Sequence, residues 1–560
     1  MQPKTGAYRS AVIRLSLIAL LIAAGIATAL LASVPPVSRD ALTHHLAVPK
    51  LYLEHGGIYE IPHLNFSYYP MNLDLLYIIP LYFKNDILPK FIHFAFALAT
   101  AAMLARYLHR RINMEYALLG ALFFLTIPVV IRLSSTVYVD LGLVCFLFAS
   151  LLFIFHWKES GFKPRYLLIS AVFCGLGLGT KYNGLVGLFL LGLFVAFVYA
   201  RYHSGEKNLS LKSAVWCAVF IMTAFILFSP WMIRNFVWTG NPVYPLYKDA
   251  LKTEAKSTDL SPNTMSEAKS RMSHIQIRRK IFRESWVEIA LIPLRVFFQG
   301  KDDNPRYFDG KLNPFLLFLP VLAFFGIRSA DRRVKSEKFM MLLFSVLFLL
   351  YACAQTSIRI RYFSPILPPL VILSIFGLYN LQTTILQPTH RISNFLKKTA
   401  IFVVVAAMLG FNAVYMAERF QQDQPIAYIS GDITRNQYIQ RFRPEYASFQ
   451  YANRNLSKND KILGLYIGNR GYYSDIPIEF SIEILQKIAA KTDSGKAVAE
   501  ILYKKGFTHL LLNFSLFGQY AKEYSMHEKK VLKEFFEDYT ITKFSEDGYG
   551  LLWLKQEAKR

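Results

Sequence analysis

Eleven apolar stretches, most of them about 20 residues long, restrict the folds open to this sequence. A helix needs roughly 20 apolar residues to cross the ~30 Å hydrocarbon layer of a membrane. The stretches lie near residues 11–34, 88–108, 115–133, 137–156, 166–181, 184–201, 212–232, 312–328, 338–355, 362–380 and 398–416. The sequence therefore predicts an α-helical polytopic membrane protein with about eleven spans.

The basic residues indicate how these spans are oriented. The net charge is +25, but Lys and Arg gather in loops between the apolar stretches, which favours membrane headgroups over nucleic acid as their partner. Every alternate loop is basic, and cytoplasmic loops are typically basic. We therefore place the N-terminus in the cytoplasm, which puts the C-terminus outside. These loops carry Arg106, Arg110 and Arg111; Lys158, Lys163 and Arg165; Arg201, Lys207 and Lys212; Arg328, Arg332, Arg333, Lys335 and Lys338; and Arg391, Lys397 and Lys398.

A twelfth apolar stretch, Met71 to Phe83, does not fit this count. If it crossed the membrane, every later basic loop would change sides, and its 13 residues are short for a span. We therefore expect a re-entrant or interfacial helix on the outer face. The outer parts are then the loops 35–87 and 233–311, the turns before Asp140 and at Lys181, and the chain after residue 417.

The sequence changes character after residue 420. Short runs typical of β-strands lie at 461–468, 508–514 and 549–554, and a helical stretch from Ile482 ends at Gly506, which suits a helix C-cap. Strands that alternate with helices predict a small α/β domain outside the membrane. We therefore expect a membrane domain at 1–420 and a terminal domain at 421–560 that supports the first or docks an acceptor.

Asp40, His44 and His45 directly follow the first span. Ionisable groups at a membrane rim are costly to keep and are functional candidates. Partial loss of water raises the pKa of a carboxyl group and would make Asp40 a better general base toward an acceptor hydroxyl or amine, with the histidines orienting that acceptor. The alternative is that Asp40 pairs with Arg39 or caps a helix from Ala41 to Leu53.

Two further acidic positions lie on the outer side. Asp140 begins an apolar span, where a carboxylate either serves chemistry or complements the helix dipole. Asp302 and Asp303 are adjacent, but without a third spaced ligand they indicate a solvated turn rather than a metal site. The neighbouring His44 and His45 are likewise a weak metal signature, which leaves a bound divalent metal open. Cys145, Cys174, Cys217 and Cys353 all fall in apolar runs, which favours neither a disulfide framework nor a zinc cluster.

Four cations lie at the outer ends of spans: Lys181, Arg234, Arg359 and Arg361. Basic residues there run against the positive-inside trend and therefore need a partner. Phosphate suits them, because Arg can bind it with two hydrogen bonds and Lys neutralises it. For each cation alone, a side chain that reaches toward lipid headgroups is an equal alternative.

Six short motifs follow one another along the chain: Arg39-Asp-Ala-Leu-Thr-His-His-Leu46, Tyr68-Tyr-Pro-Met-Asn72, Gly179-Thr-Lys-Tyr-Asn-Gly184, Pro230-Trp-Met-Ile-Arg-Asn235, Thr239-Gly-Asn-Pro-Val-Tyr-Pro245 and Arg359-Ile-Arg-Tyr-Phe-Ser-Pro365. Taken in this order, they resemble the motifs of GT-C membrane glycosyltransferases, and within them the bacterial branch related to protein O-mannosyltransferases, aminoarabinose transferases and lipopolysaccharide galacturonosyltransferases. The resemblance covers roughly residues 1 to 420 and the terminal domain in outline.

The resemblance implies inverting transfer of a sugar from a polyprenyl-phosphate carrier to a lipid, glycan or protein acceptor, at the periplasmic face of a bacterial inner membrane. It implies that Asp40 is the general base and Asp140 a second acid, and that Arg359, Arg361 and Tyr362 lie near the carrier phosphate, with Lys181 and Arg234 as further candidates. Tyr69, with His44 and His45, would orient the acceptor. The chain departs from the family in lacking an acid adjacent to Asp40 and a Lys in the Tyr-Tyr-Pro-Met stretch.

The chemistry agrees with the resemblance, because Arg can neutralise a polyprenyl phosphate leaving group without a required metal cofactor. An oligosaccharide ligase or polymerase is the nearest alternative; it would keep an outer Arg but would dispense with Asp40. A lipid or glycan transporter is another, although its charges would lie deeper and internal repeats would be expected.

Overall fold

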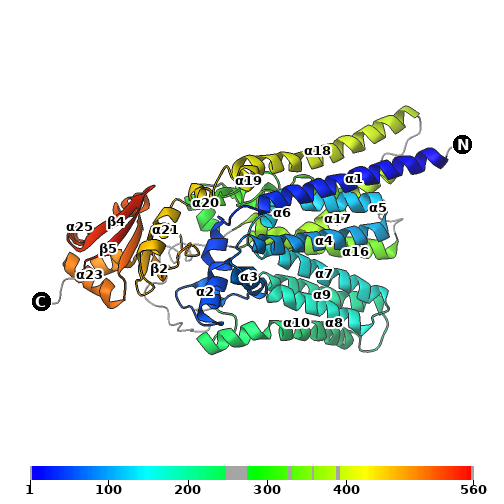
Figure 1. Ribbon diagram of the computed structural model, residues 1–560. Helices are drawn as coiled ribbons and strands as arrows, with labels where there is room; N and C mark the ends of the chain where they lie inside the picture. Colours follow the sequence, from blue (N-terminus) through cyan, green and yellow to red (C-terminus); the bar gives the residue numbers. More distant parts are fainter. Residues whose placement is uncertain (1–2, 248–273, 326–330, 356–357, 386–390, 556–560) are drawn as a thin grey trace.

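The computed structural model describes residues 3–247, 274–325, 331–355, 358–385 and 391–555. Long helices lie side by side in a bundle, and a smaller domain with a β-sheet lies beyond one end of it (Figure 1). The bundle is built from α1 (Pro3–Ala32), α4 (Leu88–Arg111), α5 (Met114–Thr126), α6 (Pro128–Ser134), α7 (Asp140–Glu159), α8 (Pro164–Leu178), α9 (Gly184–Tyr202), α10 (Leu209–Thr239), α15 (Phe315–Leu322), α16 (Arg332–Cys353), α17 (Leu367–Asn380) and α18 (Arg391–Asp423).

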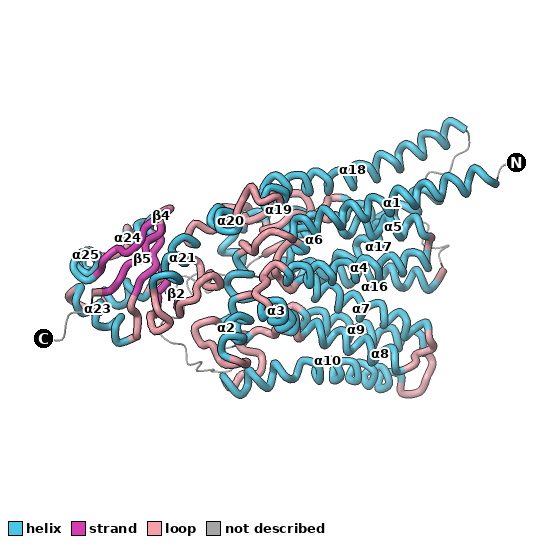
Figure 2. Tube along the Cα trace, in the orientation of Figure 1, coloured by secondary structure: helices cyan, strands magenta, loops and turns pink. Residues whose placement is uncertain are grey.

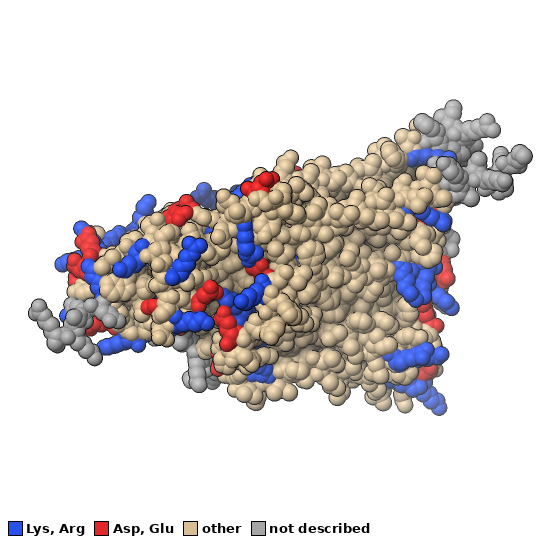
Figure 3. Space-filling view, in the orientation of Figure 1, with Lys and Arg blue, Asp and Glu red and all other residues tan. Residues whose placement is uncertain are grey.

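The predicted multi-pass helical membrane protein is confirmed. Among the described residues, eight helices are long and apolar enough to cross a membrane, or nine if α5 and α6 form one bent span. The predicted stretches near 166–181 and 312–328 form the shorter helices α8 and α15. Figure 3 shows a broad band almost free of charged side chains between two charged ends, as a membrane-embedded surface requires. The count of eleven spans and their orientation stay predictions.

Proline and glycine shape the packing of the bundle. α5 and α6 meet at an angle of 66° because Pro128 has no N–H to donate and keeps Ile127 out of the helical region. A Cβ on Gly377 of α17 would lie 2.1 Å from the carbonyl oxygen of Leu319, so only glycine allows α17 to approach α15 this closely. Apolar side chains of α1 such as Leu15 and Ile22 are exposed, as lipid-facing residues are.

Short elements gather at the end of the bundle that faces the smaller domain, where Figure 2 shows most of the loops. They are the π-helical turn η1 (Ala41–His45), α2 (Ala47–His55), η2 (Asn65–Tyr68), α3 (Asn72–Tyr82), α12 (His274–Gln276), η3 (Ile277–Ile281), α13 (Trp286–Ala290), α14 (Ile292–Arg295), η4 (Pro305–Tyr307), η6 (Ile360–Ile366) and, elsewhere, η7 (Leu381–Ile385). The stretch Met71 to Phe83 forms α3, which packs on the start of α7, where Tyr77 Oη donates to the carbonyl oxygen of Tyr138. Figure 1 shows α3 nearly end-on, across the direction of the long helices.

The C-terminal region has the predicted α/β character. It contains α19 (Pro425–Ile429), α20 (Arg435–Phe442), α21 (Tyr446–Asn455), β1 (Ile462–Leu465), β2 (Ile478–Ser481), α22 (Ile484–Ala489), α23 (Gly495–Lys504), β3 (His509–Asn513), α24 (Phe514–Ala521), α25 (Met526–Tyr539), β4 (Thr540–Glu546) and β5 (Tyr549–Leu554). The sheet order is β2-β1-β3-β5-β4, with β1 parallel to both neighbours and β5 antiparallel to both of its own. Apolar clusters cover both faces of the sheet.

Candidate active site

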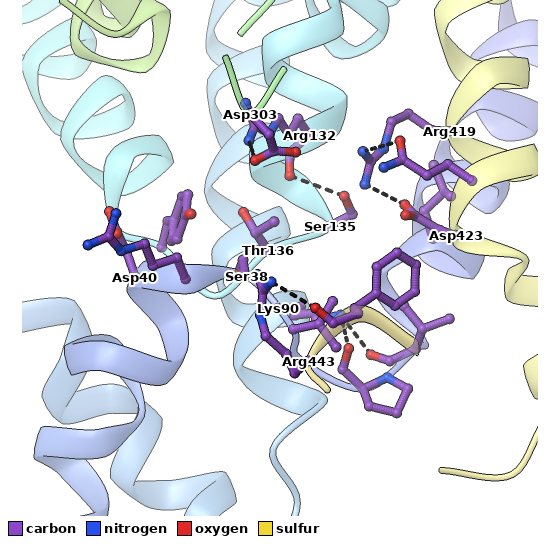
Figure 4. A pocket seen from close by; sticks show the side chains of 18 of the residues that line it. Ser38, Asp40, Lys90, Arg132, Ser135, Thr136, Asp303, Arg419, Asp423 and Arg443 are labelled. Atoms are coloured by element: carbon purple, nitrogen blue, oxygen red, sulfur yellow. Dashed lines mark hydrogen bonds and ion pairs between the residues drawn. The ribbon is translucent and has the colours of Figure 1, made fainter. Parts of the chain in front are cut away.

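Asp40 lies in the wall between two cavities at the end of the bundle nearest the C-terminal domain. Cavity A, of about 190 Å³, is lined by residues that include His44, His45, Tyr69, Asp74, Lys181, Arg361 and Tyr362. Cavity B, of about 360 Å³, extends on the other side toward α18 and the C-terminal region (Figure 4). Arg39, Asp40 and Arg359 line both cavities. A group bound in either one would therefore meet the Asp40 carboxylate.

The Asp40 carboxylate is paired with two of the predicted phosphate-binding cations. Arg361 donates a hydrogen bond to Oδ2 of Asp40, and Nη1 of Arg359 lies 3.8 Å from the same oxygen. Burial raises the pKa of Asp40, but the positive charges outweigh it, Arg361 most, and hold that pKa well below its usual range. The expected rise in the pKa of Asp40 is therefore wrong. The alternative prediction, that Asp40 caps the following helix, is also wrong, because its side chain accepts no capping hydrogen bond. The ion-pair partners of Asp40 are Arg359 and Arg361 instead of the predicted Arg39.

Asp140 belongs to the same cluster. It is the first residue of α7 and is 1% exposed. Lys181, in the turn after α8, donates a 2.7 Å hydrogen bond to Oδ1 of Asp140, and Nη1 of Arg361 lies 3.9 Å from Oδ2. The Lys181 ammonium also lies 5.1 Å from the ring centre of Tyr362. Arg361 thus stands between the two predicted catalytic acids, and eight of the predicted site residues line cavity A.

Cavity A also contains a carboxylate that the sequence analysis missed. Asp74 of α3 is 2% exposed, and its Oδ1 lies 2.7 Å from Nδ1 of His45. Burial raises the pKa of Asp74 to about 7 and lowers that of His45 to about 3. His44 stacks on Phe66, with ring centres 4.4 Å apart. An acid inside the otherwise apolar stretch Met71–Phe83 was the signal that could have identified Asp74.

Cavity B is rich in charge of both signs. Arg132 of α6 lies 3.2 Å from Asp302, 2.7 Å from Asp303 and 3.0 Å from Asp309. The predicted solvated turn is confirmed at Asp303, whose side chain is 75% exposed, whereas the Asp302 side chain is 16% exposed. Both carboxylates also neutralise the half-buried Arg132. Farther along the cavity, Arg419 pairs with Asp423 at 2.5 Å (Figure 4).

Arg234 is not part of the cluster. Its guanidinium donates to the carbonyl oxygen of Tyr69 at 3.1 Å and lies 4.6 Å and 4.9 Å from the ring centres of Trp231 and Trp238. It lines neither cavity. Its contact with the Tyr69 backbone supports a wall of cavity A from behind.

The β1–β2 loop (466–477) of the C-terminal region contributes to both cavities, and Tyr438, Phe442 and Arg443, at α20, also line cavity B. Gly468 and Asn469 line cavity A, and Arg470 lines cavity B. Lys50 of α2 holds this loop through hydrogen bonds to the carbonyl oxygen of Ser474 and to Asp475, both at 2.8 Å. The terminal domain therefore supplies part of the site wall.

Similarity to known structures identifies the fold. ArnT from Cupriavidus metallidurans in the apo state superposes with a TM-score of 0.57 at 12% identity, covering 96% of this chain and 97% of ArnT. ArnT bound to undecaprenyl phosphate gives 0.56 at 12% identity, with the same coverage. The apo oligosaccharyltransferase from Archaeoglobus fulgidus gives 0.50 at 10% identity, covering 89% of this chain and 70% of that one. The chain has the GT-C fold.

Part of the helical bundle also matches a family model in sequence. The family model for dolichyl-phosphate-mannose-protein mannosyltransferases matches residues 83–233. That range includes Asp140 and Lys181 but neither Asp40 nor Arg361. No curated protein matches the sequence. The predicted GT-C fold is thus confirmed, while the roles of the single residues stay predictions.

Within the described part of the GT-C chain, no three His, Cys, Asp or Glu side chains come together as a metal ion would require. His45 bonds to Asp74 through Nδ1, and His44 stacks on Phe66. The residues of cavity A therefore do not fit a metal site built on the two histidines.

Proposed function

We propose that this chain is a membrane glycosyltransferase that moves a sugar from a polyprenyl-phosphate carrier to a lipid, glycan or protein acceptor at the periplasmic face of a bacterial inner membrane. The observation that carries the proposal is the cluster of Asp40, Lys181, Arg359 and Arg361 in the wall of a cavity at one end of the bundle, with the buried Asp140 bonded to Lys181. The GT-C fold, and the undecaprenyl phosphate bound by ArnT, support it.

The cations of the cluster suit the phosphate of the carrier. A phosphate that enters cavity A meets Arg361, Arg359 and Lys181, which are now held by carboxylates. Arginine binds phosphate as readily as carboxylate, so the carrier phosphate competes with Asp40 for Arg361. Tyr362, beside Lys181, would close this phosphate site.

Competition between the carrier phosphate and Asp40 for Arg361 would also control the basicity of the Asp40 carboxylate. As long as Arg361 holds Asp40, the low pKa of that carboxylate makes it a weak base. Once the phosphate takes Arg361, Asp40 regains basicity beside the acceptor. The acceptor oxygen then attacks the anomeric carbon, its proton passes to Asp40, and the bond between that carbon and the phosphate oxygen breaks. Polyprenyl phosphate leaves with the electron pair, stabilised by the cations, and attack from the opposite side inverts the configuration.

His44, His45 and Tyr69 line the same cavity and would orient the acceptor hydroxyl toward Asp40. Asp74 fixes the ring of His45 through its hydrogen bond at Nδ1, which leaves the other ring nitrogen for a ligand.

Sugar transfer in membranes from cells that express the chain tests the proposal. We expect Asp40→Asn to lower transfer by about 100-fold to 10,000-fold while donor binding persists, measured with radiolabelled polyprenyl-phosphate sugars and native lipid-linked glycans. The matched control is Asp432→Asn, an exposed carboxylate outside both cavities. Equal transfer by wild type and Asp40→Asn would remove Asp40 as the base, and no transfer from any donor would favour a transporter or a ligase.

A further inference from the structure

A second candidate site lies at the opposite end of the bundle from Asp40. A groove of about 360 Å³ runs between the C-terminal ends of α4 and α7. Contacts between Arg111 and Glu159, and between Arg110 and His156 at 3.4 Å, hold these two helix ends together. We refer to this hollow as the α4–α7 groove.

The floor of the α4–α7 groove is apolar and its rim is basic. Met103, Ala149, Leu152, Phe153 and Phe155 belong to the lining, together with the basic residues Arg106, Arg110, Arg111 and His156. The one carboxylate of this lining, Glu159, is paired with Arg111. Figure 3 shows Lys and Arg side chains gathered at this end of the molecule. An apolar floor with cations at its rim matches a lipid, whose acyl chain and charged headgroup are joined in the same way.

The three arginines at the rim differ in whether they are paired with carboxylates. Arg111 is occupied: it pairs with Glu159 and lies 2.9 Å from the buried Glu337. Arg106 and Arg110 are exposed, and neither has a carboxylate partner within the described part of the chain. The dipole of α4 accounts for basic residues in its last turn, but Arg106 stands more than one turn before Arg111, where the helix ends.

We propose that the α4–α7 groove binds one anionic glycerophospholipid, with its phosphate on Arg106 and Arg110 and an acyl chain along Met103, Leu152 and Phe153. Charge complementarity selects an anionic headgroup over a zwitterionic one, because two arginines near one phosphate favour a lipid whose net charge is negative. The apolar floor selects a lipid over free phosphate. This site is separate from the proposed transferase site, so its test needs no sugar transfer.

Lipid retention by the purified full-length protein tests this inference. Native mass spectrometry would count dioleoyl phosphatidylglycerol and dioleoyl phosphatidylcholine bound to wild type and to the double variant Arg106→Ala/Arg110→Ala. We expect the double variant to bind phosphatidylglycerol about 30-fold more weakly, as two arginines near a headgroup imply, with phosphatidylcholine binding unchanged. Inorganic phosphate at the same concentration should not compete with the lipid.

The matched control is Arg165→Ala/Arg201→Ala, which removes two exposed arginines that do not line the groove. We expect this control to bind phosphatidylglycerol like wild type. A second variant, Arg106→Lys/Arg110→Lys, keeps the charge and should retain most of the binding, which separates loss of the site from loss of the fold. Equal phosphatidylglycerol binding by wild type and the alanine variant, an equal loss in the control, or full competition by inorganic phosphate would each overturn the proposal.

Discussion

Asp40 and Arg361 show how a residue can be predicted correctly while its partner is not. Each stands at the rim of a span, which sequence reasoning can detect, but their sequence separation is 321 and only the fold brings them together. The pairing reverses the expected pKa of Asp40, because a carboxylate beside two arginines is stabilised in its charged form. Asp74 was not predicted as a site residue, because most of its neighbours in sequence are apolar and its partner, His45, lies on another element.

Asp74 gives a prediction at the scale of one residue. Its pKa of about 7, against 3.8 for an exposed carboxyl, means that the unfolded chain ionises it before the folded chain does. Between pH 3.8 and about pH 7, the carboxyl group of Asp74 is therefore more fully protonated in the folded state than in the unfolded state. The contribution of Asp74 to the free energy of unfolding falls as the pH rises through this range. We expect the melting temperature of wild type to fall more than that of Asp74→Asn from about pH 5 to about pH 7.5.

Thermal unfolding of both proteins in the same detergent, followed across this pH range, measures the difference. The groups that face Asp74 in this cavity, namely His44, His45 and Lys181, are present in both proteins. Parallel curves for the two proteins would show that Asp74 is ionised in the folded state and that the pKa shift is absent.

At the scale of elements, β1, β3 and β5 lie within the predicted ranges, because buried apolar runs carry a clear signal. The predicted helical stretch from Ile482 to Gly506 is divided into the two helices α22 and α23. Strands β2 and β4 were missed. β4 reads Thr-Ile-Thr-Lys-Phe-Ser-Glu and is largely exposed at the edge of the sheet, and β2 has only four residues at the other edge. The contribution of the β1–β2 loop to the cavity walls could not be predicted from the sequence either, because it depends on how the C-terminal domain packs against the helical bundle.

The β1–β2 loop is expected to depend on Lys50. Lys50→Met removes three hydrogen bonds, to the carbonyl oxygens of Tyr472 and Ser474 and to Asp475, and a charged donor of this kind contributes about 2 kcal/mol. We expect faster cleavage of residues 466–477 by a protease and up to about 100-fold slower sugar transfer, because displaced wall residues misplace the substrates.

Lys84→Met is the control for this prediction, since Lys84 is exposed and lines neither cavity. Limited proteolysis followed by mass spectrometry locates the cleavage, and the transfer assay gives the rate. If Lys50→Met were as resistant and as active as the control, the loop would not depend on this anchor.

For the whole molecule, the apolar stretches predicted the helical bundle well, because membrane length is a strong constraint on sequence. α8 and α15 are shorter than the apolar stretches that predicted them, and each still exposes apolar side chains, such as Leu168 and Phe318. Side-chain pairing across the bundle could not be predicted, because it joins residues from different spans.

Orientation is the prediction that belongs to this scale. Positive-inside counting places the C-terminal domain outside and the basic loops inside. Lys458→Cys lies on an exposed loop of the C-terminal domain, and Lys207→Cys on the loop between α9 and α10. We expect a membrane-impermeant maleimide to label Lys458→Cys in intact spheroplasts and Lys207→Cys only after permeabilisation. The wild-type cysteines give the background, and the opposite pattern would invert the topology and place the transferase site in the cytoplasm.

In the proposed mechanism, the carrier phosphate replaces Asp40 on Arg361. The most direct test is the affinity of the purified protein for undecaprenyl phosphate, measured for wild type, Asp40→Asn and Arg361→Gln, with melting temperatures to show that each is folded. The account predicts tighter binding by Asp40→Asn, which removes the competing carboxylate, and at least about 10-fold weaker binding by Arg361→Gln. Weaker binding by Asp40→Asn, or unchanged binding by Arg361→Gln, would contradict it.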